Sequence, residues 1–287
     1  MKVNQISVVI PAKNEAKAIG MLIKELFTVC DDVVAEVIVV NDGSTDETAE
    51  VANAAGATVV SHPYSKGNGA AIKSGARAAN SDIIVFMDGD GQHKASDIPR
   101  LLDELERGYD AVVGARDNTS QASAGRSIAN NFYNRLASYM TGQSVKDLTS
   151  GFRAVRAEKF REFLYLYPNG FSYPTTSTMA FFRAGYSISY IPIVAEKRIG
   201  NSHISPIKDG VRFLLIIFKI GTLYSPLKIF VPVSLTVFLI GISYYAYTFI
   251  TASRFTNMSA LMFTTALIIF MVGLVSEQIT NLMYKSK

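Results

Sequence analysis

Two aspartates stand two residues apart, directly after an apolar run at residues 82–87. In extended backbone this spacing points the carboxylates of Asp88 and Asp90 to the same side, and the glycines between and after them leave room for a ligand. Carboxylate oxygens suit a magnesium or manganese ion, which keeps several coordination positions for substrate phosphates. The spacing therefore predicts a divalent cation beside a phosphorylated substrate. The alternative is an Asp-Gly turn that only ends a strand.

Two more polar turns follow apolar runs earlier in the chain, PAKNE at residues 11–15 and NDGSTD at residues 41–46. The apolar runs predicted as strands lie at residues 6–10, 36–40, 57–60, 82–87 and 110–115. The segments between them carry apolar residues at helical spacing, as at 15–29 and 98–107. This alternation predicts an α/β fold with a Rossmann-like, mainly parallel sheet and helices on both faces. Ligands of such sheets bind beyond the carboxyl ends of the strands, where the three polar turns would meet.

The last part of the chain changes character, because no charged residue occurs at residues 229–253 or 255–276. Each run exceeds the roughly 20 residues that a helix needs to cross a membrane. The two runs predict a transmembrane helical hairpin whose turn lies near Arg254, and the alternative is a pair of buried helices in a larger soluble domain. The expected parts are a catalytic domain at 1–205, an interfacial amphipathic segment at 206–226 and two transmembrane helices at 227–287.

Charge and cysteine content indicate where the protein is located and which partners and sites it can have. Lysines flank the hairpin on both sides, which by the positive-inside rule predicts a multi-pass membrane protein with its catalytic domain in the cytosol. The net charge of +4 allows anionic lipids or phosphorylated substrates as partners. The sequence has no basic stripe with interleaved aromatic residues, so a nucleic acid is not an expected partner. The single cysteine, Cys30, excludes an intramolecular disulfide and a cysteine-based zinc cluster.

The ordered motifs VIPAKNEA, VVNDGSTD, GNGAAIKSG, MDGDGQH, VVGAR, LTSGFRAVR and PIVAEKRIGNS resemble a known family. The family is the GT2 glycosyltransferases, and within it the dolichyl-phosphate mannose synthase-like polyprenyl-phosphate glycosyltransferases. The resemblance implies a GT-A fold over residues 5 to about 205. It also implies transfer of a sugar from a UDP- or GDP-linked donor to a polyprenyl phosphate, with inversion of configuration and with Mg²⁺ or Mn²⁺ as cofactor.

The same resemblance implies roles for individual residues. Those implied to bind the nucleotide-sugar are Pro11, Ala12, Lys13, Glu15, Val40, Asp42, Asp88, Arg116, Arg198 and His203. Those implied to surround the metal are Asp88, Asp90 and Gln92. Arg126 and Asn130 would meet the acceptor phosphate, and Asp90, Arg116 and Arg126 would be catalytic. Guanidinium groups pair bidentately with phosphate oxygens, which supports the arginines on chemical grounds.

Four positions depart from the family pattern. Lys13 stands where the family often has a tyrosine, and Asn41 stands where it often has an aspartate, so contacts to the base differ. His203 follows the serine of the late GxS motif where a basic residue is common. Asn130 occupies a place where a serine is expected.

Three functions follow from these observations. Transfer to a lipid phosphate needs no general base, since a phosphate is already anionic at pH 7. The alternative enzyme transfers sugar to a hydroxyl on a lipid, glycan or protein, with Asp147 as its base. A catalytically silent membrane scaffold or nucleotide sensor is the third. The partners expected for the first are a nucleotide-sugar, a polyprenyl phosphate, membrane lipids and a second copy of the chain.

Overall fold

The computed structural model describes most of the chain, and the chain divides into two compact units. The described residues are 5–116, 124–170, 172–194, 215, 218, 221–222 and 224–285, without the side chains of 124–129 and 284–285. The first unit consists of Met1–Tyr139 and Gln143–Ile204, and the second of Met140–Gly142 and Ser205–Lys287.

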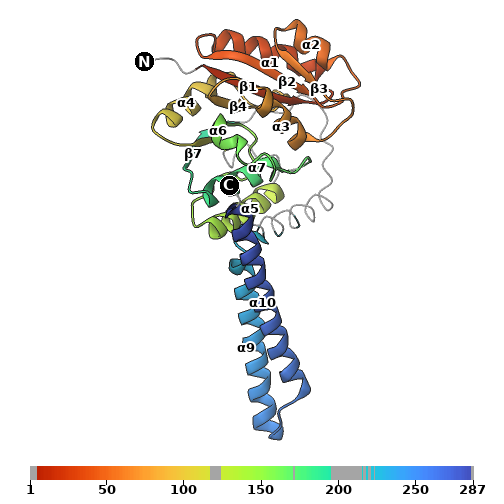
Figure 1. Cartoon of the computed structure of the whole chain (residues 1–287), viewed down its shortest axis with the longest axis vertical. Coiled ribbons are helices and arrows are strands. Elements are labelled where there is room, and N and C mark those ends of the chain that lie inside the picture. The colour runs from red at the N-terminus through yellow and green to blue at the C-terminus, as the bar shows by residue number, and fades with distance from the viewer. Residues whose placement is uncertain are drawn as a thin grey trace. The chain divides into compact units, whose positions relative to one another are not determined.

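The first unit is built on a seven-stranded sheet with the order β3-β2-β1-β4-β6-β5-β7 (Figure 1). The strands are β1 (Ile6–Ala12), β2 (Val34–Asn41), β3 (Thr58–Ser61), β4 (Ile83–Phe86), β5 (Ala111–Arg116), β6 (Arg153–Arg156) and β7 (Ile188–Ile193). Strand β6 runs antiparallel to both of its neighbours, β4 and β5, and the other pairs are parallel. The predicted α/β fold with a mainly parallel sheet is confirmed, and all five predicted strands form.

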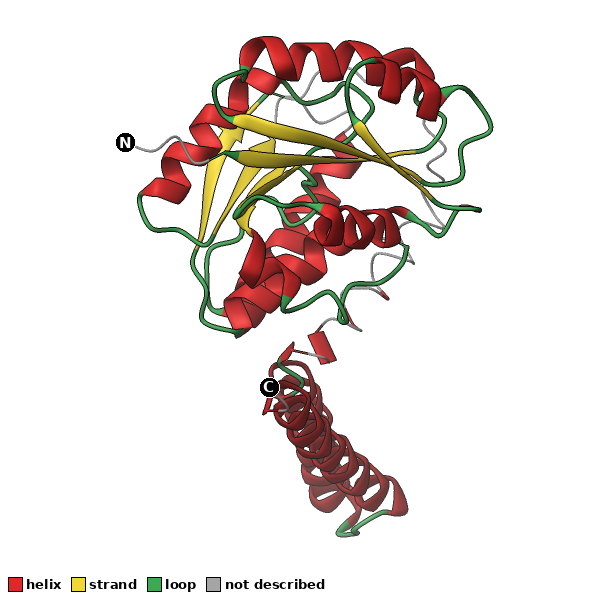
Figure 2. Cartoon of the chain, turned by 45° about the horizontal axis from the view of Figure 1, so that its top comes forward, coloured by secondary structure: helices red, strands yellow, loops and turns green. Residues whose placement is uncertain are grey.

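Helices cover both faces of this sheet (Figure 2). Their bounds are α1 (Ala16–Val29), α2 (Thr48–Ala54), α3 (Asn68–Ala78), η1 (Ala95–Asp97), α4 (Ile98–Glu106), α5 (Ala124–Thr141), α6 (Ala157–Arg161) and α7 (Tyr173–Arg183). Strand β1 shows how the two layers arise. Val8 and Ile10 are fully buried in a core cluster with α1, α2 and α4, whereas Val9 faces Gly75 of α3 on the other side. A strand buried on both faces needs the near-continuous apolar run seen in the sequence.

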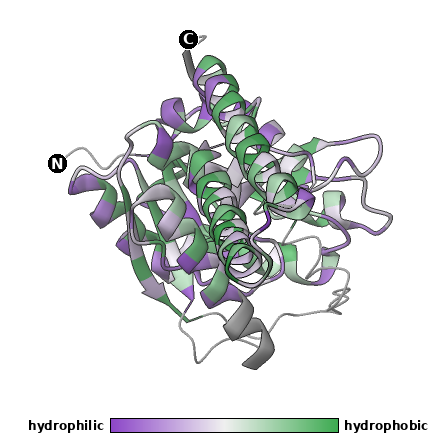
Figure 3. Cartoon of the chain, turned by 90° about the horizontal axis from the view of Figure 1, so that it is seen from below, coloured by the Kyte–Doolittle hydropathy of each residue, from purple (hydrophilic) through white to green (hydrophobic). Residues whose placement is uncertain are grey.

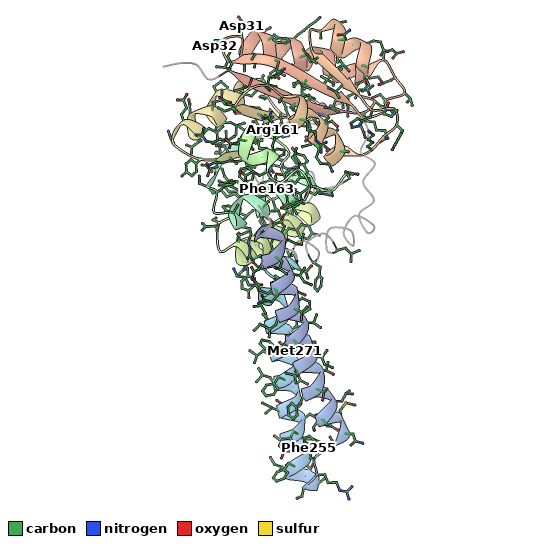
Figure 4. All side chains as sticks on the ribbon, in the orientation of Figure 1. Asp31, Asp32, Arg161, Phe163, Phe255 and Met271 are labelled. Atoms are coloured by element: carbon green, nitrogen blue, oxygen red, sulfur yellow. The ribbon has the colours of Figure 1, made fainter. Side chains whose placement is uncertain are left out.

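The second unit contains the two long helices of a hairpin, α9 (Leu227–Ala252) and α10 (Asn257–Lys285). Both are long and apolar enough to cross a membrane. Hydrophobic residues dominate both helices in Figure 3. Met271 of α10 and Phe255 of the turn, both labelled in Figure 4, have 51% and 61% of their surface exposed. The turn between the helices lies at residues 253–256, where the sequence predicts it, and begins with Ser253 in the left-handed conformation.

The two helices of the hairpin pack closely along their length. Two glycines allow this approach, since a Cβ on Gly273 would lie 2.6 Å from the Cβ of Phe230, and one on Gly241 would lie 3.1 Å from Phe263. The hydroxyl of Ser234 donates a 2.7 Å hydrogen bond to the carbonyl of Ala266 across the pair. Small residues and interhelical hydrogen bonds of this kind stabilise helix pairs in lipid, where the hydrophobic effect does not drive association.

Candidate active site

A pocket of about 470 Å³ opens at the carboxyl ends of β1, β2 and β4. Its lining residues are Pro11, Ala12, Lys13, Glu15, Asp42, Ser65, Gly67, Asn68, Ala71, Asp88, Gly89, Asp90 and Gln92. The three polar turns that the sequence places at this edge of the sheet therefore meet, and the turn before α3 joins them. A concave site with several carboxylates at the strand ends is where a doubly wound sheet binds its ligands.

The turns after β1 and β2 are linked by side chains. Asn14 has a φ of 57°, and its Oδ1 accepts a 2.8 Å hydrogen bond from the backbone N–H of Thr45. The backbone N–H of Glu15 donates to Thr48 Oγ1 at 2.9 Å, and the N–H of Ala16 donates to Asp46 Oδ2 at 3.2 Å. These bonds fix the pocket wall that carries Lys13 and Glu15, and they account for the left-handed backbone at Asn14, which asparagine tolerates better than most residues.

Asp42 organises the turn before α3. Its carboxylate is bonded to His62 Nδ1 at 2.7 Å, Ser65 Oγ at 2.8 Å, and the backbone N–H groups of Lys66 and Gly67 at 2.8 and 2.9 Å. Burial alone would raise the pKa of this carboxyl, but the hydrogen bonds from these four residues outweigh it and hold the pKa below its ordinary value. Asp42 therefore lines the pocket while its oxygens shape the adjacent wall.

His62 connects this turn to helix α3. The ring is buried, and its Nε2 lies 2.9 Å from Ser74 Oγ while Nδ1 lies on Asp42. The row Asp42, His62, Ser74 has the order of a catalytic triad, but Ser74 lies in the second turn of α3 and does not line the pocket. We interpret the row as a brace that holds β2, β3 and α3 at one edge of the sheet.

The first turn of α3 is tied to a distant part of the chain. The backbone N–H groups of Gly69 and Ala70 donate to the carbonyls of Gly170 and Asn169 at 3.2 and 2.8 Å. A Cβ on Gly69 would lie 2.0 Å from the carbonyl oxygen of Pro168, so only glycine fits. Helix N-termini often bind phosphate through such N–H groups. Here the chain uses these two donors itself, so they are not available to a diphosphate.

Asp88, Asp90 and Gln92 lie together in the pocket. Asp90 is 8% exposed, whereas the side chain of Asp88 is 38% exposed. Behind them His93 is buried, stacked on Phe152, with its Nε2 3.8 Å from Asp88 Oδ2. Two carboxylates and an amide are the hard oxygen donors that Mg²⁺ or Mn²⁺ prefers, so these residues fit such an ion.

Two observations bear on that fit. Gly151 lies against Asp88, and a Cβ there would come 3.1 Å from Asp88 Oδ2, so glycine keeps this carboxylate accessible. The described residues contain no group of three or more His, Cys, Asp or Glu side chains that could hold a metal alone. A cation at this place would therefore complete its coordination with oxygens from water or from a substrate, as is usual for magnesium at phosphate sites.

Arg116, at the carboxyl end of β5, forms a bidentate ion pair with Asp147. Its Nε and Nη2 donate to the two carboxylate oxygens at 2.9 and 3.1 Å, and Nη2 also donates to Thr149 Oγ1 at 2.6 Å. Asp147 further accepts hydrogen bonds from the backbone N–H groups of Thr149 and Ser150. Burial would raise the pKa of Asp147, but Arg116 and the backbone N–H of Thr149 hold it below its ordinary value. Asp147 is thus occupied and a poor base.

A second arginine, Arg153 of β6, is buried with 2% exposure. Its guanidinium donates to the hydroxyls of Ser177 and Thr178 and to the backbone carbonyls of Pro174 and Ser150. Among the described residues no carboxylate pairs with it. The arrangement fixes α7 to the sheet next to the turn that carries Asp147 and Gly151.

Most of the predicted site residues in the first half of the sheet line the pocket, and the others fall into three groups. Val40 is fully buried within β2, where it packs toward Gly75 rather than lining the pocket. Arg116 is held by Asp147, and Asn130 is half-buried in α5. Arg198, His203 and the side chain of Arg126 lie outside the described residues.

Several pocket residues were not predicted from the sequence. They are Ser65, Gly67, Asn68 and Ala71, with His62 behind them. The signal for His62 is its position directly after a strand that pairs with β2, because its N–H donates to the carbonyl of Asn41 as the next rung of that pairing.

The fold is of the GT-A type. Residues 7–164 match the family Glycosyl transferase family 2, and residues 225–282 match the GtrB C-terminal hairpin. The chain belongs to glycosyl transferase family 2 and is a glycosyltransferase. The predicted family is confirmed.

Relatives and solved structures agree with this assignment. Glycosyltransferase AglJ of Haloferax volcanii is 29% identical over 96% of this chain and 94% of its own length. Dolichyl-phosphate hexose transferase of the same organism is 31% identical over 72% and 90%. Undecaprenyl-phosphate 4-deoxy-4-formamido-L-arabinose transferase of Photorhabdus laumondii is 33% identical, but only over 54% of this chain and 50% of that protein.

Among solved structures, glucosyl-3-phosphoglycerate synthase from Mycobacterium tuberculosis matches with a TM-score of 0.61 and 26% identity. The match covers 75% of this chain and 79% of the synthase, whose structure contains Mn²⁺, UDP-glucose and phosphoglyceric acid.

Proposed function

We propose that this chain transfers a sugar from a UDP- or GDP-linked donor to a polyprenyl phosphate, with inversion of configuration. The observation that carries the proposal is the pocket at the ends of β1, β2 and β4, which joins Lys13, Glu15 and Asp42 to the acidic turn after β4. One side of it suits a nucleoside and the other a diphosphate. The relatives named as dolichyl- and undecaprenyl-phosphate transferases support the acceptor.

On the donor side, the base and ribose would lie against the turns after β1 and β2. Asp42 acts there chiefly through the wall that it holds together, because its oxygens already accept hydrogen bonds from residues 62–67. Glu15 is fixed by its backbone bond to Thr48, so its side chain is presented from a rigid turn. Positioning of this kind is a main source of rate acceleration when no covalent intermediate forms.

On the diphosphate side, Asp88, Asp90 and Gln92 would hold a divalent cation. Such an ion supplies positive charge to a diphosphate leaving group. The Mn²⁺ in the structure of glucosyl-3-phosphoglycerate synthase, which shares this fold, supports a divalent cation. Burial lowers the pKa of Arg116, but the charge of Asp147 and, to a smaller extent, that of Asp88 raise it. The guanidinium and the acidic turn after β4 therefore share one electrostatic environment.

The state of Asp147 favours a phosphate acceptor over a hydroxyl acceptor. A hydroxyl must lose its proton during attack, and Asp147 was the base expected for that reaction. Its oxygens are taken by Arg116, Thr149 and Ser150, and its pKa is lowered, so it has little tendency to accept a proton. A phosphate monoester carries about 1.5 to 2 negative charges at pH 7 and needs no base.

The hairpin supports a membrane location for this reaction. Two long apolar helices with outward-facing hydrophobic side chains suit anchoring in the bilayer, where a polyprenyl chain resides. The catalytic unit would lie on the cytosolic side, as the lysines around the hairpin indicate.

The decisive experiment compares two acceptors that differ only in their head group. The full chain is purified in detergent and given a panel of UDP- and GDP-sugars with either a polyprenyl monophosphate or the corresponding polyprenol. Release of nucleoside diphosphate is measured with Mg²⁺, with Mn²⁺ and with excess chelator. We expect release with the phosphate only, and only when a divalent cation is present.

A matched variant pair controls for folding. Asp90→Asn removes a proposed metal ligand, whereas Asp103→Asn changes an exposed acid on α4 that does not line the pocket. We expect Asp90→Asn to lower turnover by orders of magnitude and Asp103→Asn to leave it unchanged. Efficient transfer to the polyprenol, or full activity in chelator, would contradict the proposal.

A further inference from the structure

The chain between α5 and β6 includes a turn at residues 147–152. It has no regular secondary structure, yet all of its residues except Thr149 are buried. Buried carbonyls outside helices and strands need partners from side chains or water. Three carbonyls of the 147–152 turn accept hydrogen bonds from side chains, at Leu148 from Thr175, at Ser150 from Arg153 and at Gly151 from Tyr173. Side chains of α7 and β6 therefore fix this turn.

Tyr173 connects the turn to the acidic residues after β4. The residue is 2% exposed, and its hydroxyl donates a 2.7 Å hydrogen bond to the carbonyl of Gly151. A Cβ on Gly151 would lie 3.3 Å from this hydroxyl and 3.1 Å from Asp88 Oδ2, so the three groups are neighbours. The ring also packs edge-on against Phe86, the last residue of β4, with 5.9 Å between ring centroids. Tyr173 thus contacts both the strand that leads to Asp88 and the glycine beside its carboxylate.

Arg153 joins the same turn to helix α7. Its guanidinium donates to the carbonyl of Ser150 on one side, and to the carbonyl of Pro174 and the hydroxyl of Thr178, both at 3.2 Å, on the other. The guanidinium carbon lies 5.7 Å from the centroid of the Tyr173 ring. A planar guanidinium can reach partners in several directions at once, which a single ammonium group cannot do in the same way. Arg153 therefore fixes the distance between the turn and the helix that carries Tyr173.

The other end of the turn holds the Arg116 guanidinium. Asp147 pairs with Arg116 and accepts a 3.1 Å hydrogen bond from the backbone N–H of Ser150. The hydroxyl of Ser150 donates to a carbonyl of β5 at 2.6 Å. A displacement of the turn would therefore change two things together, the orientation of Arg116 and the space beside Asp88.

We propose that Tyr173 and Arg153 are positioning residues of the transfer reaction. They hold the 147–152 turn, and the turn sets the positions of the Asp88 carboxylate and of Arg116. Neither Tyr173 nor Arg153 lines the pocket, so both act through the turn. Small shifts matter here, because a displacement of about 1 Å at a reacting group can lower a rate by about 100-fold. The inference rests on the divalent cation in the proposed function.

Tyr173→Phe tests this with the smallest change, because it removes the hydroxyl and keeps the ring against Phe86. The matched control is Tyr186→Phe, which removes a hydroxyl that donates to Glu162 at 2.8 Å. Tyr186 lies directly before β7, at the opposite edge of the sheet from Arg116. Arg153→Lys is the second test, since it keeps the charge and loses the planar fork.

Three quantities are measured on the full chain in detergent. The electron paramagnetic resonance signal of free Mn²⁺ gives the Kd for Mn²⁺ in the presence of UDP or GDP, corrected for Mn²⁺ that the nucleotide binds alone. The affinity for UDP or GDP in excess chelator reports on the nucleoside side of the pocket. The turnover number is measured at saturating Mn²⁺, and thermal unfolding is followed for each variant.

We expect Tyr173→Phe to raise the Kd for Mn²⁺ about tenfold, the size of one lost hydrogen bond to a buried carbonyl. The turnover number should stay low at saturating Mn²⁺, because Arg116 is also displaced, and nucleotide affinity in chelator should not change. Arg153→Lys should give the same pattern, and Tyr186→Phe should leave all three quantities unchanged.

Two kinds of result would contradict this inference, and they are distinguishable. If both test variants unfold at a lower temperature but keep the Mn²⁺ affinity and turnover number of the unchanged chain, Tyr173 and Arg153 are only structural and the proposed function stands. The same conclusion follows if Tyr186→Phe weakens Mn²⁺ binding as much as Tyr173→Phe. If the unchanged chain binds no Mn²⁺ with either nucleotide, the cation of the proposed function is wrong, and this inference is wrong with it.

Discussion

Two buried aspartates, Asp42 and Asp147, are each surrounded by hydrogen-bond donors, but they serve different structures. Asp42 takes its bonds from His62, Ser65 and two backbone N–H groups, all within one turn of the chain. Asp147 takes two of its bonds from a guanidinium across the fold. Asp42 therefore fixes the conformation of a loop, and Asp147 fixes the orientation of the Arg116 guanidinium. The donor pocket is built by local hydrogen bonds around Asp42, and the region beyond β5 by an ion pair between distant residues.

The largest effect should come from Asp42→Ala. The variant leaves the N–H groups of Lys66 and Gly67 and the Ser65 hydroxyl without their acceptor, and unpaired groups of this kind cost about 1–3 kcal/mol each, partly offset by water. We expect the affinity for the nucleotide-sugar to fall by about two orders of magnitude, equal to about 3 kcal/mol. Titration of the donor into the detergent-solubilised chain measures this.

Ser65→Ala is the matched control for that variant, since it removes one of the four bonds and leaves the carboxylate. We expect Ser65→Ala to weaken donor binding by about 1 kcal/mol. An Asp42→Ala protein that binds donor normally would show that the pocket wall does not depend on Asp42, and the comparison with Asp147 would fail.

The second effect concerns Asp147→Asn, which weakens a largely buried ion pair. We expect a loss of about 2 kcal/mol in stability, between the values for exposed and buried pairs, and a lower rate of transfer. If Asp147 acts by holding Arg116, then Arg116→Gln should give a similar loss and the double variant should be no worse than either. A base would behave differently, because its loss adds to that of the arginine. Rates of the three variants with a saturating acceptor decide between these outcomes.

A third effect should appear at acidic pH. The folded-state pKa values of Asp42 and Asp147 are lowered, so both carboxylates contribute stability that is present above the unfolded pKa of about 3.9 and lost as pH falls below it. The midpoint of thermal unfolding should drop steeply below about pH 4. Asp147→Asn should show a shallower drop than the unchanged chain, and equal slopes would mean that its pKa is not lowered.

The smallest effect should come from Ser74→Ala. It removes one hydrogen bond to His62 Nε2 and leaves the bond between His62 and Asp42, so we expect at most about 1 kcal/mol in stability. The KM for the donor should rise slightly, and that for the acceptor should not change. A rise in the acceptor KM would mean that the Asp42 turn also affects the second half of the sheet. The regions around Asp42 and Asp147 would then not act separately.

The sequence predicts the first half of the sheet well and the second half poorly, for a physical reason. Strands β1, β2 and β4 are buried on both faces, so they appear as continuous apolar runs. Strand β6 has the sequence RAVR, and its Arg153 is buried against two hydroxyls and one carbonyl of α7 and against the carbonyl of Ser150. A buried charge whose partners are mostly distant neutral groups leaves no local pattern. Strand β7 contains Pro192, which also obscures a strand.

The candidate site follows the same division. The acids after β4 and the turn after β1 are visible in the sequence because each directly follows an apolar strand. His62 could not be assigned, because its role depends on the pairing of β2 with β3 and on Ser74 of α3. Arg116 was visible as a cation at a strand end, but its partner Asp147 is 31 residues away and was read as a base rather than as its counter-ion.

The ties between α3 and the residues near 168 have a consequence for biosynthesis. Besides the backbone bonds of Gly69 and Ala70, Lys73 Nζ donates to the carbonyl of Tyr167, and Arg161 donates to the carbonyl of Ala76. Partners separated by more than 80 residues can meet only after the ribosome has released both. A nascent chain that ends before residue 160 thus contains every acid of the pocket but lacks the residues that hold α3 in place. Nucleotide binding should arise late in synthesis, shortly before the hydrophobic hairpin emerges for insertion.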